Sequence, residues 1–465
     1  MPWSWNQANK HWLTIIWVGI FILHALVYLA LIPPWQAPDE PTSVELVLTM
    51  EAQHRFVNRG DEIPEIQREI IDSMERNRFW DLGGYGRPLN NNDERNFRGI
   101  WHCCSSQLVS PPFYQVLLLP VAKLTKVWGI DQQLRMLRLA TILLAALTVA
   151  VVAQIGFELV EIHPAIPLLL PAFVSLSPQF AYSSATVNSD NLAALIGTLL
   201  FWRLLRVFRD GITAAVIVQL ALLILLGFVT KRTTLLVVPA LLLALTWQAI
   251  VMVKGRDKRL GSKSLIAVSG GLATLCLLIA AVPAFRSPVK ASVLLYVFKN
   301  DPVKQLTVLQ QIPDQHITFW VWLSGSIKHL SLTFLGNYGW HQAHISRTVA
   351  GLVLVPVLAS WGCALIWLSR SQRNLPSWIV RAVWVCIFCV ATAIMLTILG
   401  TPPEFFPQGR YLFPVIAPIC LLTTIGICAW MPRHWSRLGV GIIVCTLLAL
   451  DFYCIFAVVM PAFLR

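Results

Sequence analysis

Two adjacent carboxylates, Asp39 and Glu40, stand between Pro38 and Pro41 directly after the first membrane-length apolar run. The prolines stop the helix and stiffen the turn, so the acids are held at a fixed depth near the water–lipid boundary. A carboxylate at that depth could take a proton from the hydroxyl of an acceptor. The same sequence also fits a pair of solvated acids that only begin the next helix. The other polar residues of the chain must therefore distinguish a catalytic base from such a helix start.

Four more polar groups stand at the ends of apolar runs. They are Ser110–Tyr114, Asn188–Asn191, Lys231 with Arg232, and Gln408–Tyr411. Each has an ordinary explanation, since Asp190 can cap a helix and the basic side chains can extend to lipid headgroups. Collected on one face of an apolar protein, however, acids and bases predict a polar site at membrane depth.

Transfer of a sugar from a polyprenyl phosphate would require this mixture of side chains. Asp39 or Glu40 would be the general base, and cations would stabilise the departing phosphate as its charge grows. The predicted substrate- and phosphate-binding residues are Asp190, Lys231, Arg232, Arg410 and Tyr411. A single base with the leaving group on the opposite face of the sugar gives inversion, and nothing suggests a second, nucleophilic carboxylate at the distance that retention requires.

The composition excludes an ordinary soluble globule, because 56% of the 465 residues are hydrophobic and only 13% are charged. Recurring membrane-length apolar runs predict a polytopic helical membrane protein, and the first run lacks a cleavage pattern and is expected to be retained. His24, inside that run, is expected to make a polar contact between helices.

The net charge of +13 lies mostly in short loops, so nucleic acid is not needed to explain it. The ten cysteines show no metal-ligand spacing.

Apolar segments and two long polar loops define the organisation of the chain. The apolar segments are 11–33, 108–127, 134–158, 165–182, 191–209, 212–230, 233–253, 264–285, 347–369, 378–399, 411–430 and 437–460. They predict one all-α membrane domain over residues 1–465 with about 11–12 transmembrane segments. The loops are 34–107 and 286–346, and the first holds 13 of the 23 acidic residues, so we expect it to be structured.

Two helices are predicted inside the loop 34–107. Thr42–Glu45 fits a capping box and predicts a helix start. A second helix is predicted from Ile63, and its single apolar face, which includes Ile70 and Met74, is typical of a helix that lies flat on a membrane surface.

Loop charges predict the orientation. The short basic loops are 254–263, 370–373 and 433–437. Placing these loops in the cytoplasm puts the polar groups of the predicted site on the outer face. Counting from a cytoplasmic N-terminus agrees with this only if 108–127 or 165–182 does not cross the membrane, and the sequence does not choose between them.

Six short motifs occur in a defined order: Pro38–Pro41, Ser110–Tyr114, Asn188–Asp190, Thr230–Lys231, Phe334–Trp340 and Gln408–Pro414. The first span followed by an acidic pair resembles the GT-C superfamily of membrane glycosyltransferases, which includes protein O-mannosyltransferases and the aminoarabinose transferase of lipid A. In the six ordered motifs the chain resembles more closely a bacterial GT-C-like family of predicted membrane proteins of unknown function.

The resemblance implies a GT-C-like fold, a lipid-phosphate sugar donor and an extracytoplasmic active site. Carried over by position, Asp39 is the base, and Glu40 is its neighbour or a metal contact. The family usually has a histidine where this chain has Ser43, so any part that this histidine plays in metal or phosphate contact is in doubt here. GT-C enzymes differ in their need for a divalent cation, so a metal cofactor stays open.

We therefore expect an integral protein of the bacterial plasma membrane whose partners are membrane lipids and a lipid-linked sugar donor. A transporter or flippase for a lipid-linked glycan is one alternative, but it would carry ionisable residues near the bilayer midplane, often in repeated halves. A non-catalytic GT-C-like partner is another alternative, which Ser43 keeps open. The sequence names neither the sugar, the acceptor nor the oligomeric state.

Overall fold

The computed structural model describes residues 7–58, 60–82, 111–254, 319–340, 342–371, 375–401 and 407–464. In this part of the chain, eight helices are long and apolar enough to cross a membrane. Two short strands, β1 (Asn337–Tyr338) and β2 (Ala343–His344), pair in antiparallel register. The prediction of an all-α polytopic membrane protein is confirmed, and the apolar segment 264–285 lies outside the described residues.

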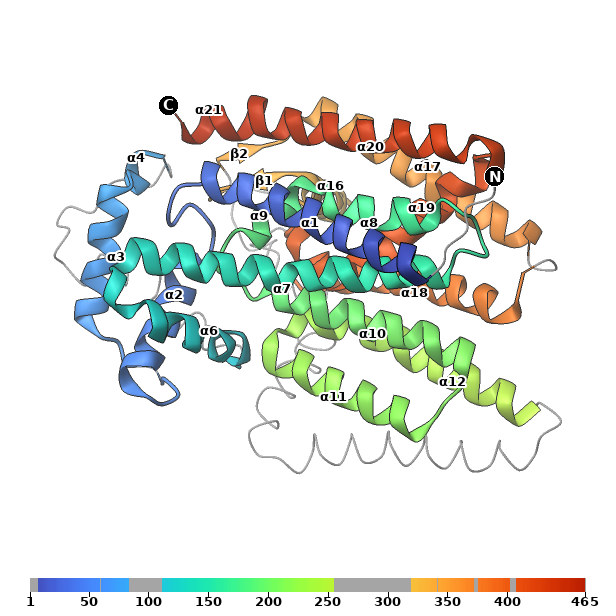
Figure 1. Ribbon diagram of the computed structural model, residues 1–465, viewed down its shortest axis with the longest axis horizontal. Helices are drawn as coiled ribbons and strands as arrows, with labels where there is room; N and C mark the ends of the chain where they lie inside the picture. Colours follow the sequence, from blue (N-terminus) through green and yellow to red (C-terminus); the bar gives the residue numbers. More distant parts are fainter. Residues whose placement is uncertain are drawn as a thin grey trace.

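The long helices run roughly along the longest axis of the molecule (Figure 1). They are α1 (Gln7–Leu31), α7 (Ile130–Glu158), α10 (Asp190–Asp210), α11 (Ala214–Thr230), α12 (Val238–Lys254), α16 (Phe319–Leu335), α17 (Arg347–Ser371), α18 (Ser377–Leu399), α19 (Ile416–Trp430) and α20 (Ser436–Tyr453), with α20 continuing through η7 (Cys454–Val459) and α21 (Met460–Phe463). The 3-10 turns η3 (Arg232–Val237) and η5 (Gly409–Val415) lead into α12 and α19.

The interior of the bundle is centred on α19. Of the most apolar stretch of each span, 89% is buried in Gly409–Trp430 but only 17% in Arg347–Arg370. The helix α17 packs against α19 on one side and exposes leucines and valines on the other. Because lipid tails are as apolar as these side chains, a membrane can cover that outer surface.

His24 makes the interhelical polar contact that the sequence predicts. Its Nδ1 lies 2.8 Å from the carbonyl oxygen of Ser175, and its Nε2 lies 2.8 Å from the carboxylate of Asp451. The hydroxyl of Tyr28 donates to the same carboxylate at 2.9 Å. All four residues are buried, and these hydrogen bonds join α1 to α8 (Ile166–Ser175) and α20 inside the bundle.

The first loop forms a helical layer at one end of the bundle, where α2 (Glu40–Gln53), α3 (Pro64–Arg76) and α4 (Phe79–Leu82) gather (Figure 1). The capping box at Thr42–Glu45 is wrong, because α2 already begins at Glu40. The predicted helix from Ile63 is confirmed as α3. Its apolar face packs on α2, α4 and α7 rather than standing open, so protein covers the surface that was expected to meet lipid.

Between the two segments that the loop charges left open, α6 (Phe113–Thr125) is the one that stays at one end of the bundle. Its 13 residues extend only about 20 Å, against about 30 Å of membrane hydrocarbon. It packs along α2, and Ala122 near its C-terminus accepts a 2.8 Å hydrogen bond from Gln133 in the first turn of α7. The chain instead returns from the far end of α7 through a broken pair, α8 (Ile166–Ser175) and α9 (Pro178–Ser184).

Candidate functional site

The turn between α1 and α2 is fixed through its backbone carbonyls. Arg138 of α7 donates to the carbonyls of Ile32 at 2.9 Å and Pro33 at 3.0 Å. The indole of Trp340, which follows β1, donates to the carbonyl of Trp35 at 3.0 Å. Elements far apart in the chain therefore set the conformation of this turn before it reaches the acidic pair.

Asp39 ends the turn in an unusual backbone conformation. It is the N-cap residue of α2 and has φ 66°, in the left-handed region that non-glycine residues seldom occupy. Such a conformation persists when the surrounding structure over-determines it, and it is often found at functional sites. The Asp39 side chain is 48% exposed, so its carboxylate lies within reach of solvent and of a bound molecule.

Glu40 faces the protein interior instead. Its two carboxylate oxygens accept hydrogen bonds from Arg138 at 2.8 Å and 2.6 Å, and the backbone N–H of Val187 donates to it at 3.0 Å. The Glu40 side chain is fully buried and that of Arg138 is 2% exposed. In this geometry the Glu40 carboxylate binds protein groups, and its predicted part as a catalytic acid or metal contact stays a prediction.

Four of the predicted site residues form one ion-pair cluster. The Arg410 guanidinium lies 2.6 Å from the Asp39 carboxylate and 3.8 Å from that of Asp190. The Lys231 ammonium lies 2.6 Å from Asp190, which is fully buried. Residues from the first loop, α10, the α11–η3 junction and η5 therefore meet at one point, and the cluster contains two carboxylates and two cations.

Two glycines bring η5 close enough to complete this cluster. A Cβ on Gly409 would lie 2.1 Å from the backbone nitrogen of Phe334 in α16, and the Gly409 N–H donates to the Thr333 hydroxyl at 2.7 Å. A Cβ on Gly197 of α10 would lie 2.1 Å from the carbonyl oxygen of Pro414. No side chain fits at either contact, so η5 is held against both helices and Arg410 is directed toward Asp190.

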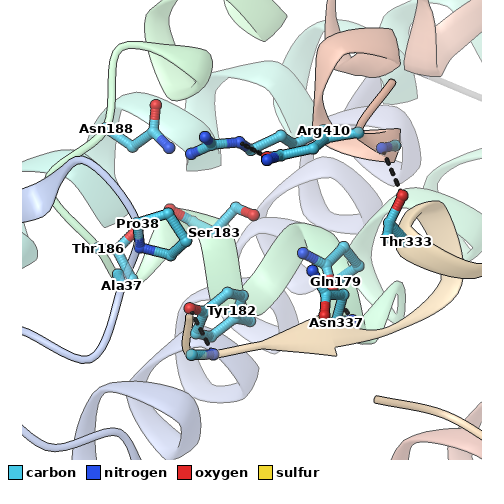
Figure 2. Close-up of a pocket in the computed structure, with 13 residues that line it drawn as sticks. Ala37, Pro38, Gln179, Tyr182, Ser183, Thr186, Asn188, Thr333, Asn337 and Arg410 are labelled. Atoms are coloured by element: carbon cyan, nitrogen blue, oxygen red, sulfur yellow. Dashed lines mark hydrogen bonds between the residues drawn. The ribbon is translucent and has the colours of Figure 1, made fainter. Parts of the chain in front are cut away.

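A polar pocket adjoins the cluster. Its lining residues include Gln179, Tyr182, Ser183, Thr186, Asn188 and Asn337. Figure 2 shows the Arg410 side chain extending across this pocket toward Asn188, with Pro38 on the opposite wall beside Ser183 and Thr186. Hydroxyl and amide groups around a guanidinium can bind a ligand that carries both hydroxyls and an anionic group.

The other two predicted binding residues lie beside the cluster. The ring of Tyr411 has the Lys231 ammonium and the Arg410 guanidinium each 5.7 Å from its centroid, so it contacts both cations. Arg232 is the first residue of η3 and is partly exposed, and its predicted contact with phosphate stays a prediction. Ser43 is buried in the first turn of α2, where its N–H donates to the carbonyl of Asp39 at 3.0 Å.

Two further residues of the site, Arg138 and Tyr182, were not predicted from the sequence. Arg138 is a charged residue inside an apolar segment, and such a residue requires a buried partner, which was the signal available. Tyr182 donates to the carbonyl of Gln36 at 3.2 Å and accepts from the N–H of Gly339 at 2.9 Å, so it fastens the turn to β1. Nothing in the sequence around Tyr182 indicates this contact.

Among the described residues, no three histidine, cysteine, aspartate or glutamate side chains gather as metal ligands would. The divalent cation that the resemblance leaves open therefore stays a prediction.

No protein-family model matches the chain, and no curated protein matches it. Its fold is similar to that of ArnT from Cupriavidus metallidurans in a crystal structure bound to undecaprenyl phosphate, with 15% sequence identity and a TM-score of 0.47. The match covers 94% of this chain and 64% of ArnT, so the chain spans less than two-thirds of that protein. At this identity and score the likeness carries no functional conclusion.

Proposed function

We propose that the protein is an inverting glycosyltransferase that moves a sugar from a polyprenyl phosphate to an acceptor hydroxyl on the extracytoplasmic side of a bacterial plasma membrane. One observation carries this proposal: a half-exposed carboxylate, Asp39, pairs with Arg410 at the edge of a polar pocket, and Lys231 belongs to the same cluster through Asp190. A base, phosphate-binding cations and hydroxyl-binding groups are what such a reaction needs at one place.

Asp39 is the proposed general base. It takes the proton from the acceptor hydroxyl while that oxygen bonds to the anomeric carbon of the sugar. The bond between this carbon and the donor phosphate oxygen breaks, and its electron pair leaves with the phosphate. Arg410 and Lys231 stabilise the charge that develops there.

The ion pair between Asp39 and Arg410 links donor binding to the activity of the base. Each cation is already paired with a carboxylate at 2.6 Å, Arg410 with Asp39 and Lys231 with Asp190. A phosphate that binds Arg410 competes with Asp39, because a planar guanidinium offers its paired N–H groups to either anion. Donor binding then releases the Asp39 carboxylate to accept a proton.

Glu40 is the proposed positioning residue. Through Arg138 it fastens the start of α2 to α7 and to the carbonyls of the preceding turn. This holds Asp39 at the pocket, and positioning to within about 1 Å matters for a base that must meet a hydroxyl.

A transporter is the second candidate, because His24 and Asp451 are ionisable and lie inside spanning helices. The hydrogen bonds described above occupy both ring nitrogens of His24 and tie the Asp451 carboxylate to His24 and Tyr28 of α1. This closed arrangement favours a structural contact between helices over a translocation pathway.

The test compares Asp39→Asn with Asp61→Asn, which removes a different acid of the same loop outside the cluster. Each variant replaces the native protein in its host, and glycan on the cell envelope is measured. We expect Asp39→Asn to lower transfer by at least about 100-fold, as loss of a general base does, and Asp61→Asn to act as the wild type. Full activity of Asp39→Asn would refute the proposal.

Binding of a polyprenyl phosphate to the purified Asp39→Asn variant gives a second measurement. The amide no longer competes as an anion for Arg410, so we expect binding at least as tight as in the wild type. Weaker binding would show that Asp39 holds the lipid phosphate site together and does not compete with it.

A further inference from the structure

A second polar cavity, of about 810 Å³, lies at the opposite end of the same helices. It is lined by residues of the first turns of α1 and α18, the last turns of α7 and α10, and the segment that follows α7. The helix α10 begins with Asp190 in the candidate site and carries Arg209 near its other end. With 21 residues at about 1.5 Å each, α10 separates the two sites by about 30 Å, the thickness of a membrane.

The cavity lining is strongly charged. Its ionised or titratable members are Lys10, His11, Glu158, Glu161, Arg206 and Arg209. The permanent cations in this lining outnumber the acids by three to two. Trp378 adds an aromatic surface from α18, so the lining combines charge with an amphipathic ring of the kind common at membrane interfaces.

Glu158 holds the two arginines in place. Its carboxylate lies 2.9 Å from Arg206 and 3.4 Å from Arg209, and it also accepts from the indole of Trp202 at 2.9 Å. Arg209 is further paired with Asp210 at 2.7 Å. One carboxylate thus orders two guanidinium groups. Arg206 contacts Glu158 through Nε and Nη2, so its Nη1 can donate to a ligand.

Lys10 supplies a further cation. Its ammonium lies 5.9 Å from the centroid of Phe157, and it makes no ion pair with the part of the chain that the structure describes. Lys10 and the outer nitrogen of Arg206 are therefore the donors that an anion entering the cavity would meet. Both belong to helix ends, where a lipid headgroup would lie.

We propose that this cavity binds a phosphate group, supplied by the headgroup of an anionic phospholipid in the leaflet opposite the candidate active site. The surrounding helix ends carry Arg203, Arg370, Arg433 and Arg437, and the positive-inside rule assigns such an end to the cytoplasm. The cytoplasmic leaflet is rich in anionic lipid, and basic pockets between helices at this level bind such headgroups. This site is independent of the proposed transferase reaction.

Native mass spectrometry of the purified, delipidated protein tests the proposal with three probes. They are dihexanoyl phosphatidylglycerol, dihexanoyl phosphatidylcholine and inorganic phosphate. We expect one phosphatidylglycerol to bind in preference to phosphatidylcholine. Lys10→Gln and Arg206→Gln should each weaken it by about fivefold, the contribution of one basic residue near a membrane surface. Arg203→Gln, on the same helix but outside the lining, should bind as the wild type does.

Several outcomes would overturn the proposal. Equal binding of the two lipids would show that the headgroup charge is not recognised. Unchanged affinity in Lys10→Gln would remove the cavity as the site. This variant stays informative if Arg206→Gln does not fold, since Lys10 makes no ion pair with the described residues. If inorganic phosphate binds as tightly as phosphatidylglycerol, a free anion replaces lipid as the source of the phosphate.

Discussion

Asp39 and Glu40 are adjacent in the sequence, yet they belong to ion pairs of opposite kinds. Glu40 is fully buried and accepts hydrogen bonds from Arg138 with both carboxylate oxygens. Asp39 is half-exposed and its described ion pair with Arg410 is a single 2.6 Å contact. The buried pair of Glu40 and Arg138, the closed pair, fixes the start of α2. The proposed function requires the half-exposed pair of Asp39 and Arg410, the open pair, to exchange its partner for a ligand.

The difference has an energetic cause. A buried charge pair repays its desolvation only with full hydrogen bonding, and breaking it leaves an uncompensated charge. An accessible carboxylate can be solvated when its partner leaves, so the exchange is far less costly. The αL conformation of Asp39 turns the two neighbouring side chains to these different surroundings.

Breaking the closed pair should have the largest effect. We expect Arg138→Met to destabilise the fold by about 3–5 kcal/mol, because the buried Glu40 loses its charged partner. Denaturation of the purified protein measures this. The double variant Arg138→Met with Glu40→Met should recover much of the loss, since neither charge remains. A single variant as stable as the wild type would contradict the buried pair.

Replacing the Arg410 guanidinium in the pair with Asp39 should lower activity and leave the fold intact. We expect Arg410→Lys to lower glycan transfer by about 100-fold, because an ammonium cannot offer the paired N–H groups of a guanidinium to a phosphate. Arg381→Lys makes the same exchange at the other end of the bundle and should be nearly silent. Equal losses in both variants would argue against a special part for Arg410.

Displacing η5 should weaken the cluster without removing a charge. In Gly409→Ala the new Cβ would meet the backbone of Phe334, so η5 must move. Overpacking of this kind costs about 1–3 kcal/mol. Gly441→Ala in α20, where a Cβ meets nothing within 4 Å, is the matched control and should be neutral or stabilising. Thermal unfolding of the two variants in parallel distinguishes these outcomes.

Arg55 and Asp61 form a more exposed ion pair in the first loop, with a distance of 2.7 Å between them. Hydrogen bonds from the Arg55 side chain, and then from the Asn58 N–H, lower the pKa of Asp61 from 3.8 to about 2. The lowered pKa means that this contact stabilises the loop above about pH 4 and is lost as the pH falls toward 2. We expect only a local change, visible as faster hydrogen exchange near residue 58. A global transition in this range would assign it to other carboxylates.

Much of the fold was readable from the sequence. Apolar runs of membrane length predicted α1, α7, α10, α17 and α18, because a helix that spans lipid must be apolar over its whole length. Loop charges, which placed the polar groups on one face, also predicted a single site for Asp39, Asp190, Lys231 and Arg410. The start of α2 was not predictable from a capping pattern, because Asp39 enters the helix through a positive φ that distant contacts impose.

By itself, the sequence determined the membrane class of the protein and which charged residues stand at the ends of spans. Those properties follow from local composition, because apolar side chains partition into lipid and charged side chains into water. Only the tertiary structure decided that Glu40 is buried against Arg138 while Asp39 is half-exposed, that α6 stays at one end of the bundle, and that a charged cavity lies at the other end. These depend on which helices meet, and the contact of Glu40 joins residues 98 positions apart. Burial at that range is a property of packing, and no local pattern specifies it.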